Sequence, residues 1–207
     1  MSKPFLLAVD ALLVTLVVAL FGIFPADQVV TVAYLSTVLY LVVTKRTNLF
    51  LHFAAASAIA ALWAYLGRGE YGYNHSYLVV GGVNLFPLFG WAAGLFAAYL
   101  LFSHEEHVFR LKGFARQLGL FVAIYWPLLV LAETVAYHVF DIHNVAAAAY
   151  PGLPLCDCLH APVWMQALYF AMGPIYFAIC WSLRLERKPR SPLLQKERGR
   201  VRSEVGH

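Results

Sequence analysis

Charged residues are scarce in this chain of 207 residues. Asp, Glu, Lys and Arg make up 13% of it, hydrophobic residues make up 61%, and the mean hydropathy is +0.68. Soluble domains contain about 25% charged residues. So few charges exclude a secreted catalytic domain or a soluble binding module, and they indicate a protein whose solvent is lipid.

Cysteine is also rare. The chain has three cysteines. Cys156 and Cys158 are separated by a single residue, a spacing that closes a disulfide only with strain, and Cys180 lies in a different apolar segment. We therefore expect no disulfide framework.

Long apolar segments make up most of the sequence. A helix of about 20 residues crosses the hydrocarbon layer of a membrane, which is about 30 Å thick. We therefore expect an all-α polytopic bundle of about six transmembrane helices in residues 1–183, with Pro87 kinking the long fourth helix. The first segment is full membrane length and carries Asp10, so we favour a membrane span over a signal peptide. The six segments are 5–24, 28–44, 48–66, 77–102, 118–140 and 162–183.

Basic residues gather on one side of this predicted topology. Arg68 is the single Lys or Arg in the three connections on the other side. Lys and Arg in short loops resist translocation, so the asymmetry predicts cytoplasmic N- and C-termini in the inner membrane. The cytoplasmic set is Lys3, Lys45, Arg46, Arg110, Lys112, Arg116 and the tail.

The formal net charge of +4 belongs to the C-terminal tail. Residues 184–207 include eight basic and three acidic residues, so the rest of the chain is close to neutral. We expect a disordered cytoplasmic tail that either attracts anionic lipid headgroups, at about 1 kcal/mol per basic residue, or only sets the topology. Membrane lipids are the expected partners, and no nucleic-acid partner is expected.

Glu133 is the most prominent polar residue inside a predicted span. A charged group in hydrocarbon is costly unless it faces a partner or a cavity, which makes it a candidate functional residue. Trp126 and Tyr137 share its helix face, so the carboxyl group is expected between two aromatic rings in the bundle. A neutral carboxyl group in such a dry place can donate a proton. The alternative is a structural glutamic acid hydrogen-bonded to a neighbouring helix.

Other polar residues lie in the remaining spans. Asn84 and Trp91 are one heptad apart in the fourth span, where Asn84 either binds substrate or bonds to another helix. Asp10 and His52 both lie in cytoplasmic halves of their spans. They could pair across an interface or belong to a proton path.

Tyrosines at two further places are candidates for a substrate site. The segment 68–77 contains tyrosines, including Tyr73 and Tyr77, which form either an aromatic belt at the membrane interface or the mouth of a substrate site. Tyr169 lies next to the predicted kink at Pro174, where side chains either line a cavity or pack in the bundle.

The outer segment 137–164 is dense in potential metal ligands. Thiolates and imidazoles are ligands for Zn or Fe, and His143, Cys156, Cys158 and His160 are the candidates. Simple hydrogen bonding of these residues and a thiol oxidoreductase remain the alternatives.

A second cluster of histidines lies on the predicted cytoplasmic side. Residues 104–107 read His-Glu-Glu-His, with the histidines three residues apart instead of the four in the zinc-protease motif. Arg110 and Lys112 follow closely. We therefore expect a solvated helix end with local ion pairs.

Two stretches carry a similar pattern of glycine, leucine and tryptophan. The stretches are GVNL at 82–85 with FGW at 89–91, and GLPL at 152–155 with APVW at 161–164. They resemble an element of the carotenoid biosynthesis membrane family typified by bisanhydrobacterioruberin hydratase, and the segment with Tyr73 and Tyr77 is also similar to that family.

This resemblance implies a multi-pass enzyme that adds water across a terminal isoprenoid double bond. The residues agree with this chemistry, with Glu133 beside Trp126 and Tyr137 as the acid, and with Trp91 and Tyr169 stabilising the carbocation. The expected substrate-binding residues are Asn84, Trp91, Trp126, Tyr137, Tyr169, Tyr73 and Tyr77. His138 or Asp157 would position or deprotonate the water. The alternatives are a transporter or ligand-binding subunit with a polar path through Asp10, His52 and Glu133, and a metal-dependent membrane enzyme.

Overall fold

The protein is an all-α bundle in a computed structural model that describes residues 3–75, 77–109, 113–145, 149–183 and 185. The helices and strands, in chain order, are α1 (Lys3–Leu20), α2 (Ala26–Val43), η1 (Thr47–Leu49), α3 (Phe50–Leu66), β1 (Val79–Val80), β2 (Val83–Asn84), α4 (Leu85–Phe109), α5 (Phe114–His138) and α6 (Val163–Ser182). The expected helical class is confirmed. Apart from Leu185, the predicted tail lies outside the described residues.

Five of these segments are long and apolar enough to cross a membrane. They are Ala26–Val43, Thr47–Leu66, Leu85–His104, Phe114–His138 and Val163–Ser182. The apolar part of α1, Phe5–Leu20, is shorter. Large apolar side chains such as Leu12, Leu35 and Leu62 are more than half exposed, as expected for surfaces that meet lipid.

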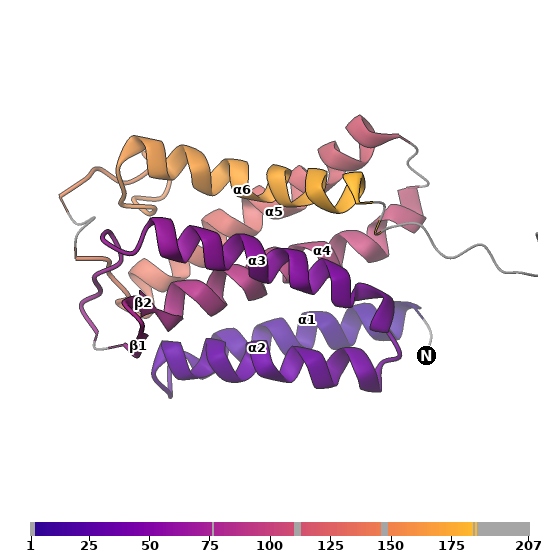
Figure 1. Cartoon of the computed structure of the whole chain (residues 1–207), viewed down its shortest axis with the longest axis horizontal. Coiled ribbons are helices and arrows are strands. Elements are labelled where there is room, and N and C mark those ends of the chain that lie inside the picture. Colours follow the sequence, from indigo (N-terminus) through magenta and orange to yellow (C-terminus); the bar gives the residue numbers. More distant parts are fainter. Residues whose placement is uncertain (1–2, 76, 110–112, 146–148, 184, 186–207) are drawn as a thin grey trace, which may run out of the picture.

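The helices lie side by side, with α4 in contact with α1, α2, α3 and α5, while α6 packs on α3 and α5 (Figure 1). The start of α1 and the 44–49 connection lie at one end, here called the inner end. The hairpin of β1 and β2 lies at the opposite, outer end, with the connections 67–78 and 139–162 (Figure 1).

Small residues let α3 approach α4 closely. Ala56, Ala60 and Ala64 recur every fourth residue and are at most 1% exposed. Rings from both helices fill the adjoining space, as Phe53 and Phe96 do with centroids 5.1 Å apart. The alanine-rich face of α3 is therefore a packing surface.

The fourth predicted span begins too early. Residues 79–84 form an antiparallel hairpin, which turns at Gly81 and Gly82 with φ of +58° and +80°. The Asn84 side chain then accepts a hydrogen bond from the Phe86 N–H at 2.9 Å, which caps α4. Pro87 lies in the first turn of α4, where a backbone N–H would have no acceptor within the helix. Its missing N–H therefore breaks no helical hydrogen bond, and the predicted kink is wrong.

The Gly-Pro pair of α6 is supported by α5. Pro174 lacks the N–H that would bond to the Phe170 carbonyl, and the Trp126 indole donates to that carbonyl instead, at 3.1 Å. The neighbouring Tyr169 carbonyl accepts from the Tyr125 hydroxyl at 2.6 Å. Trp126 therefore lies on the outside of the bundle, 44% exposed, and its expected inward position is wrong.

Cys156 and Cys158 form a disulfide, contrary to the expectation from their spacing. The residues that follow each of them, Asp157 and Leu159, have φ of +44° and +57°. This backbone brings the two cysteine Cα atoms to 5.1 Å, within the usual range for a disulfide. Gly152 packs against the turn, where a Cβ atom would lie 2.9 Å from the Cys158 carbonyl oxygen.

Candidate functional site

Hydrogen bonds join the two long connections at the outer end. Asn74 donates from its side chain to the Asp141 carbonyl at 2.7 Å and accepts from the His143 N–H at 2.8 Å. Asn144 donates to the Glu70 carbonyl at 2.7 Å. Residues 70–74 and 141–144 therefore form one layer over the outer ends of the helices.

A group of aromatic residues lies beneath this layer. We define the outer aromatic cluster as Trp63, Tyr71, Tyr73, Trp91 and Tyr169. The Trp63 indole donates to the Tyr71 hydroxyl, and the Tyr71 and Tyr169 hydroxyls are 3.3 Å apart. The Trp91 ring lies 4.8 Å from that of Tyr169. Residues from α3, α4, α6 and the 67–78 connection thus meet at one place.

The cluster continues toward the hairpin. The Tyr73 ring is 6.2 Å from that of Tyr71 and 5.2 Å from those of Tyr77 and Phe86. Burial, together with the charge of Glu133, raises the pKa of the Tyr71 and Tyr73 hydroxyls. These tyrosines therefore remain neutral hydrogen-bonding groups across the physiological pH range.

Glu133 lies beside the outer aromatic cluster. It lies in α5, within electrostatic range of the hydroxyls of Tyr71, Tyr73, Tyr125 and Tyr169. The residue is partly buried, and among the described residues its side chain has no direct hydrogen-bond partner. A carboxyl group in such surroundings is suited to acid-base chemistry on a bound molecule.

The structure thus brings together Glu133, Tyr73, Trp91 and Tyr169 from the predicted site, with Tyr77 next to them. Asn84 is absent from this group because its side chain caps α4. Trp63 and Tyr71 were missed. Their indole–hydroxyl bond joins α3 to a loop, and neither hydropathy nor helix periodicity reveals such a contact.

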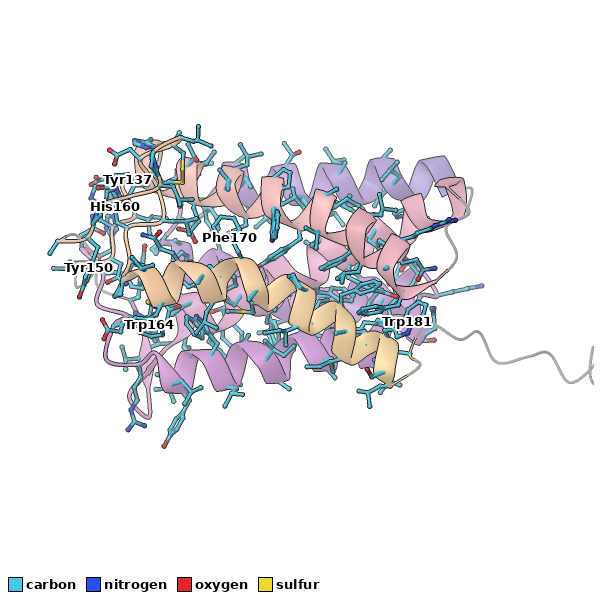
Figure 2. All side chains as sticks on the ribbon, turned by 90° about the horizontal axis from the view of Figure 1, so that it is seen from above. Tyr137, Tyr150, His160, Trp164, Phe170 and Trp181 are labelled. Carbon is cyan, nitrogen blue, oxygen red and sulfur yellow. A yellow bond between two sulfur atoms is a disulfide. The ribbon has the colours of Figure 1, made fainter. Side chains whose placement is uncertain are left out.

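Tyr137 belongs to a different group at the outer end. Its ring lies between those of His143 and His160, with centroid distances of 4.1 Å and 4.5 Å. Figure 2 shows Tyr137 and His160 together at the outer end, with Trp181 at the other end of α6.

His138 and Asp157 also belong to the outer loop. His138 Nε2 lies 2.9 Å from the Cys156 carbonyl oxygen. Asp157 is 76% exposed at its side chain and contacts His160 at 3.3 Å. Within the described part of the chain, neither residue has a hydrogen bond or ion pair with Glu133.

The four proposed metal ligands make other contacts in the structure. The disulfide removes the thiolates of Cys156 and Cys158, and the two histidines stack on Tyr137. Among the described residues, no group of three or more His, Cys, Asp or Glu side chains is arranged to hold a metal ion. The donors that the sequence placed close together thus do not converge on one point.

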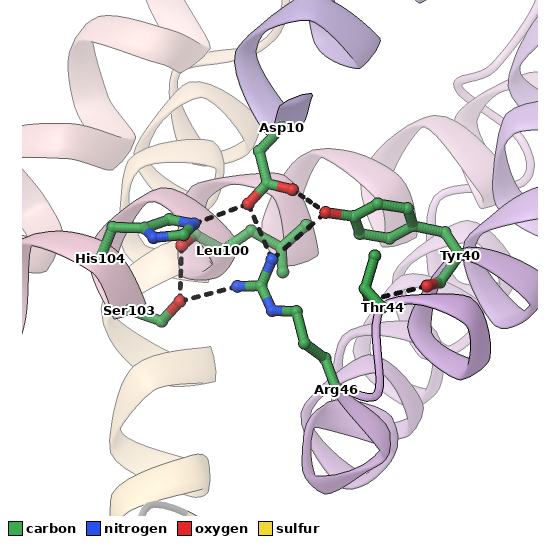
Figure 3. Close-up of polar contacts among 7 residues, drawn as sticks. All are labelled: Asp10, Tyr40, Thr44, Arg46, Leu100, Ser103 and His104. Atoms are coloured by element: carbon green, nitrogen blue, oxygen red, sulfur yellow. Dashed lines mark hydrogen bonds and ion pairs between the residues drawn. The ribbon is translucent and has the colours of Figure 1, made fainter. Parts of the chain in front are cut away.

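A second polar cluster lies at the inner end (Figure 3). Asp10 Oδ2 is 2.8 Å from Arg46 Nη1 and 2.7 Å from His104 Nε2, and Tyr40 donates to Oδ1. Arg46 also donates to Ser103 at 3.2 Å. The Asp10 side chain is only 2% exposed, and both of its carboxylate oxygens accept hydrogen bonds. The buried charge is therefore compensated.

This arrangement corrects two expectations. His104 is not part of a solvated helix end, because it is 10% exposed at its side chain and bonded to Asp10. The side chain of His107, and Arg110 and Lys112, lie outside what the structure describes. Asp10 does not pair with His52, whose ring instead stacks on Tyr99 at 4.2 Å.

The two clusters differ in what they can do. The inner cluster is fully paired and fastens α1 to α2 and α4, which is a structural arrangement. The outer aromatic cluster offers apolar ring faces near the Glu133 carboxyl group, which has no direct hydrogen-bond partner among the described residues. It is therefore the better candidate for a binding or catalytic site.

Comparison of the chain with protein-family models, with curated proteins and with solved structures found no match.

Proposed function

We propose that the protein is a multi-pass membrane enzyme that hydrates a double bond of a lipid-soluble isoprenoid, with Glu133 as the acid. The observation that supports the proposal is the partly buried Glu133 of α5, a carboxyl group in an apolar helix and within electrostatic range of the tyrosines of the outer aromatic cluster. The sequence resemblance of 82–91 and 152–164 to carotenoid hydratases supports the same reaction.

The chemistry of alkene hydration matches these side chains. A trisubstituted double bond accepts a proton from a neutral carboxylic acid in surroundings that exclude water. The tertiary carbocation that results is attracted to the faces of aromatic rings, and Trp91 and Tyr169 offer such faces next to each other. An apolar substrate can enter from the lipid, since Glu133 is partly exposed.

The proposed topology has six membrane crossings with both termini in the cytoplasm. It takes α1 as the sixth crossing, although its apolar part is the shortest of the six. The disulfide would then face the oxidising side of the inner membrane, which agrees with where such bonds form.

Comparative mass spectrometry tests the proposed reaction. Carotenoid-producing bacterial cells would express the wild type, Glu133→Gln or Glu70→Gln, and their pigment extracts would be compared. We expect a product heavier by one water with the wild type and at least a hundredfold less of it with Glu133→Gln, because the amide cannot donate the proton.

Glu70→Gln is the matched control. It makes the same change in the outer connection, where Glu70 contributes a backbone carbonyl to Asn144, so product formation should persist. Extracts that are identical for the wild type and for cells without the protein would refute hydration of the isoprenoids present. Equal product from Glu133→Gln and the wild type would refute the role of Glu133.

A further inference from the structure

A pocket opens at the outer end, between the turn that joins α1 to α2 and the two long connections. We define the outer pocket by its lining side chains, which include Phe21, Phe24, His75, Tyr77 and Phe140. None of these belongs to the outer aromatic cluster. The volume of the pocket is about 260 Å³. An apolar cavity of about 150 Å³ holds benzene, so the outer pocket has room for about ten carbon atoms.

Aromatic rings form much of the pocket wall. The Phe21 and Phe140 rings meet edge to face with centroids 5.7 Å apart. Ile23 and Phe24 of the same turn are 72% and 53% exposed, as expected for a surface that meets lipid. In the proposed topology this turn lies at the outer membrane surface, so an apolar ligand can reach the pocket from the lipid.

His75 adds a hydrogen-bond acceptor to the apolar wall. Its Nε2 lies 3.0 Å from the Asp141 carbonyl oxygen, which can only accept, so Nε2 carries the proton of the neutral ring. The other nitrogen, Nδ1, is then an acceptor. Among the described residues Nδ1 has no hydrogen-bond partner.

Tyr77 adds a hydroxyl group next to His75. The two rings are 5.9 Å apart, and the Tyr77 hydroxyl likewise has no hydrogen-bond partner in the part of the chain that the structure describes. The Leu78 N–H donates to the Asp27 side chain at 3.0 Å, which holds this segment against the first turn of α2. The outer pocket thus combines apolar rings with an acceptor and a donor on neighbouring side chains.

A hydroxyl group is the smallest group that matches both of these side chains. It can donate to His75 Nδ1 and accept from the Tyr77 hydroxyl, whereas a carbonyl group can only accept and a hydrocarbon can do neither. We propose that the outer pocket binds the hydroxyl-bearing end of an apolar lipid, with His75 as the acceptor and Tyr77 as the donor. This binding site does not depend on the proposed hydration, although the tertiary alcohol from that reaction belongs to the same ligand class.

Binding of a saturated alcohol tests the site. The full chain in lipid nanodiscs would be dialysed against 3,7-dimethyloctan-3-ol or 2,6-dimethyloctane, which share one carbon skeleton and differ only in the hydroxyl group. Neither contains a double bond, so the proposed hydration cannot alter them. Gas chromatography would measure how much ligand is retained beyond the amount in empty nanodiscs of the same lipid.

The hydroxyl group should account for the difference between the two ligands. Relative to ligand dissolved in the lipid, we expect the wild type to bind the alcohol at least about threefold more tightly than the hydrocarbon. His75→Phe and Tyr77→Phe should each weaken alcohol binding about threefold to tenfold, because each removes one hydrogen bond. Both variants keep a ring in the wall, so hydrocarbon binding should not change.

Tyr150→Phe is the matched control. It removes a tyrosine hydroxyl at the outer end from a residue that is 41% exposed and does not line the pocket, so both ligands should bind as they do to the wild type. Near-ultraviolet circular dichroism would verify the packing of the aromatic rings in each variant. If one pocket variant fails to fold, the other still decides the result.

Three results would overturn the proposal. Equal affinity for alcohol and hydrocarbon would show that the pocket recognises no hydroxyl group. Unchanged alcohol binding in a folded His75→Phe or Tyr77→Phe would remove that residue from the site. Retention no greater than in empty nanodiscs would show that the pocket binds neither ligand. None of these results involves Glu133 or a reaction, so the proposed hydration would be judged separately by the pigment extracts.

Discussion

Single side chains complete hydrogen bonds that the backbone cannot make for itself. Pro174 frees the Phe170 carbonyl, and Trp126 supplies the missing donor. In a membrane no water is available to do this, so an unpaired carbonyl would cost several kcal/mol. The Tyr125 hydroxyl donates to the Tyr169 carbonyl, and it can do so because Gly173 leaves room for the Tyr125 ring.

Gly173 is therefore expected to tolerate no side chain. A Cβ atom there would overlap the Tyr125 ring, so Gly173→Ala should destabilise the fold by about 1–3 kcal/mol. Reversible unfolding in mixed detergent micelles would measure the change.

The matched control is Gly94→Ala in α4. A Cβ atom at Gly94 meets no atom within 4 Å, and alanine favours a helix by about 1 kcal/mol over glycine, so this variant should be as stable as the wild type or more so. Equal stability of both variants would contradict the packing described for α5 and α6.

The sequence singled out Glu133 as a candidate residue but misplaced its neighbour Trp126. A carboxyl group in an apolar run is conspicuous because its burial is expensive. When residues are apolar around most of a helix, as in α5, the sequence does not tell which face points into the bundle. Contact with α6 decided that Trp126 lies on the outside of the bundle.

Whole elements are held together by a few buried polar contacts. At the inner end, Asp10 joins α1 to Arg46 after α2 and to His104 in α4 (Figure 3). Helix α1 also packs on α2 and α4, and its exposed surface carries apolar residues such as Leu12 and Leu16. The Asp10 cluster therefore defines how α1 docks.

Removing the Asp10 carboxylate should weaken this docking strongly. Asp10→Leu leaves Arg46 buried without a counter-charge, which costs about 3–5 kcal/mol. Replacing both partners, as Asp10→Leu with Arg46→Met, should recover most of that stability. Unfolding in mixed micelles would supply the four free energies of the double-mutant cycle.

Thr15→Val serves as the control in the same helix, because the exposed Thr15 hydroxyl bonds only to the Ala11 carbonyl of its own turn. It should change stability by less than about 0.5 kcal/mol. Additive effects of Asp10→Leu and Arg46→Met would show that the two side chains do not interact.

Helices were more predictable than the hairpin. Uniform hydropathy over about 20 residues identifies a helix whatever its partners are. The stretch 77–84 is equally apolar, and its hydropathy placed it at the start of the fourth predicted span. It became a turn because both glycines adopt positive φ and because Leu78 N–H bonds to the Asp27 side chain at 3.0 Å.

At the scale of the molecule, the bundle has two chemically distinct ends. The inner end contains the fully paired ionic cluster, and the outer end contains the disulfide, the histidines and the aromatic cluster (Figures 1 and 2). The predicted topology assigns the inner end to the cytoplasmic side and the outer end to the opposite side.

This polarity predicts which side of the membrane each end faces. A membrane-impermeant maleimide applied to intact spheroplasts should label Val80→Cys, since Val80 is 58% exposed in the outer hairpin. Asn48→Cys in the inner connection should react only after the membrane is opened. The wild type is the background control, because Cys180 is buried and the other cysteines form a disulfide. The reverse labelling pattern would invert the proposed orientation.

The sequence by itself determined the solvent, the helical class and the asymmetry of charge, because these depend on composition and on runs of neighbouring residues. The tertiary structure alone decided the partners: Asp10 with Arg46 and His104, Cys156 with Cys158, and Tyr71 between Trp63 and Tyr169. In a chain that is apolar nearly throughout, many packings bury the same surface. Matching each buried donor to an acceptor selects among them, and that match requires distances in space.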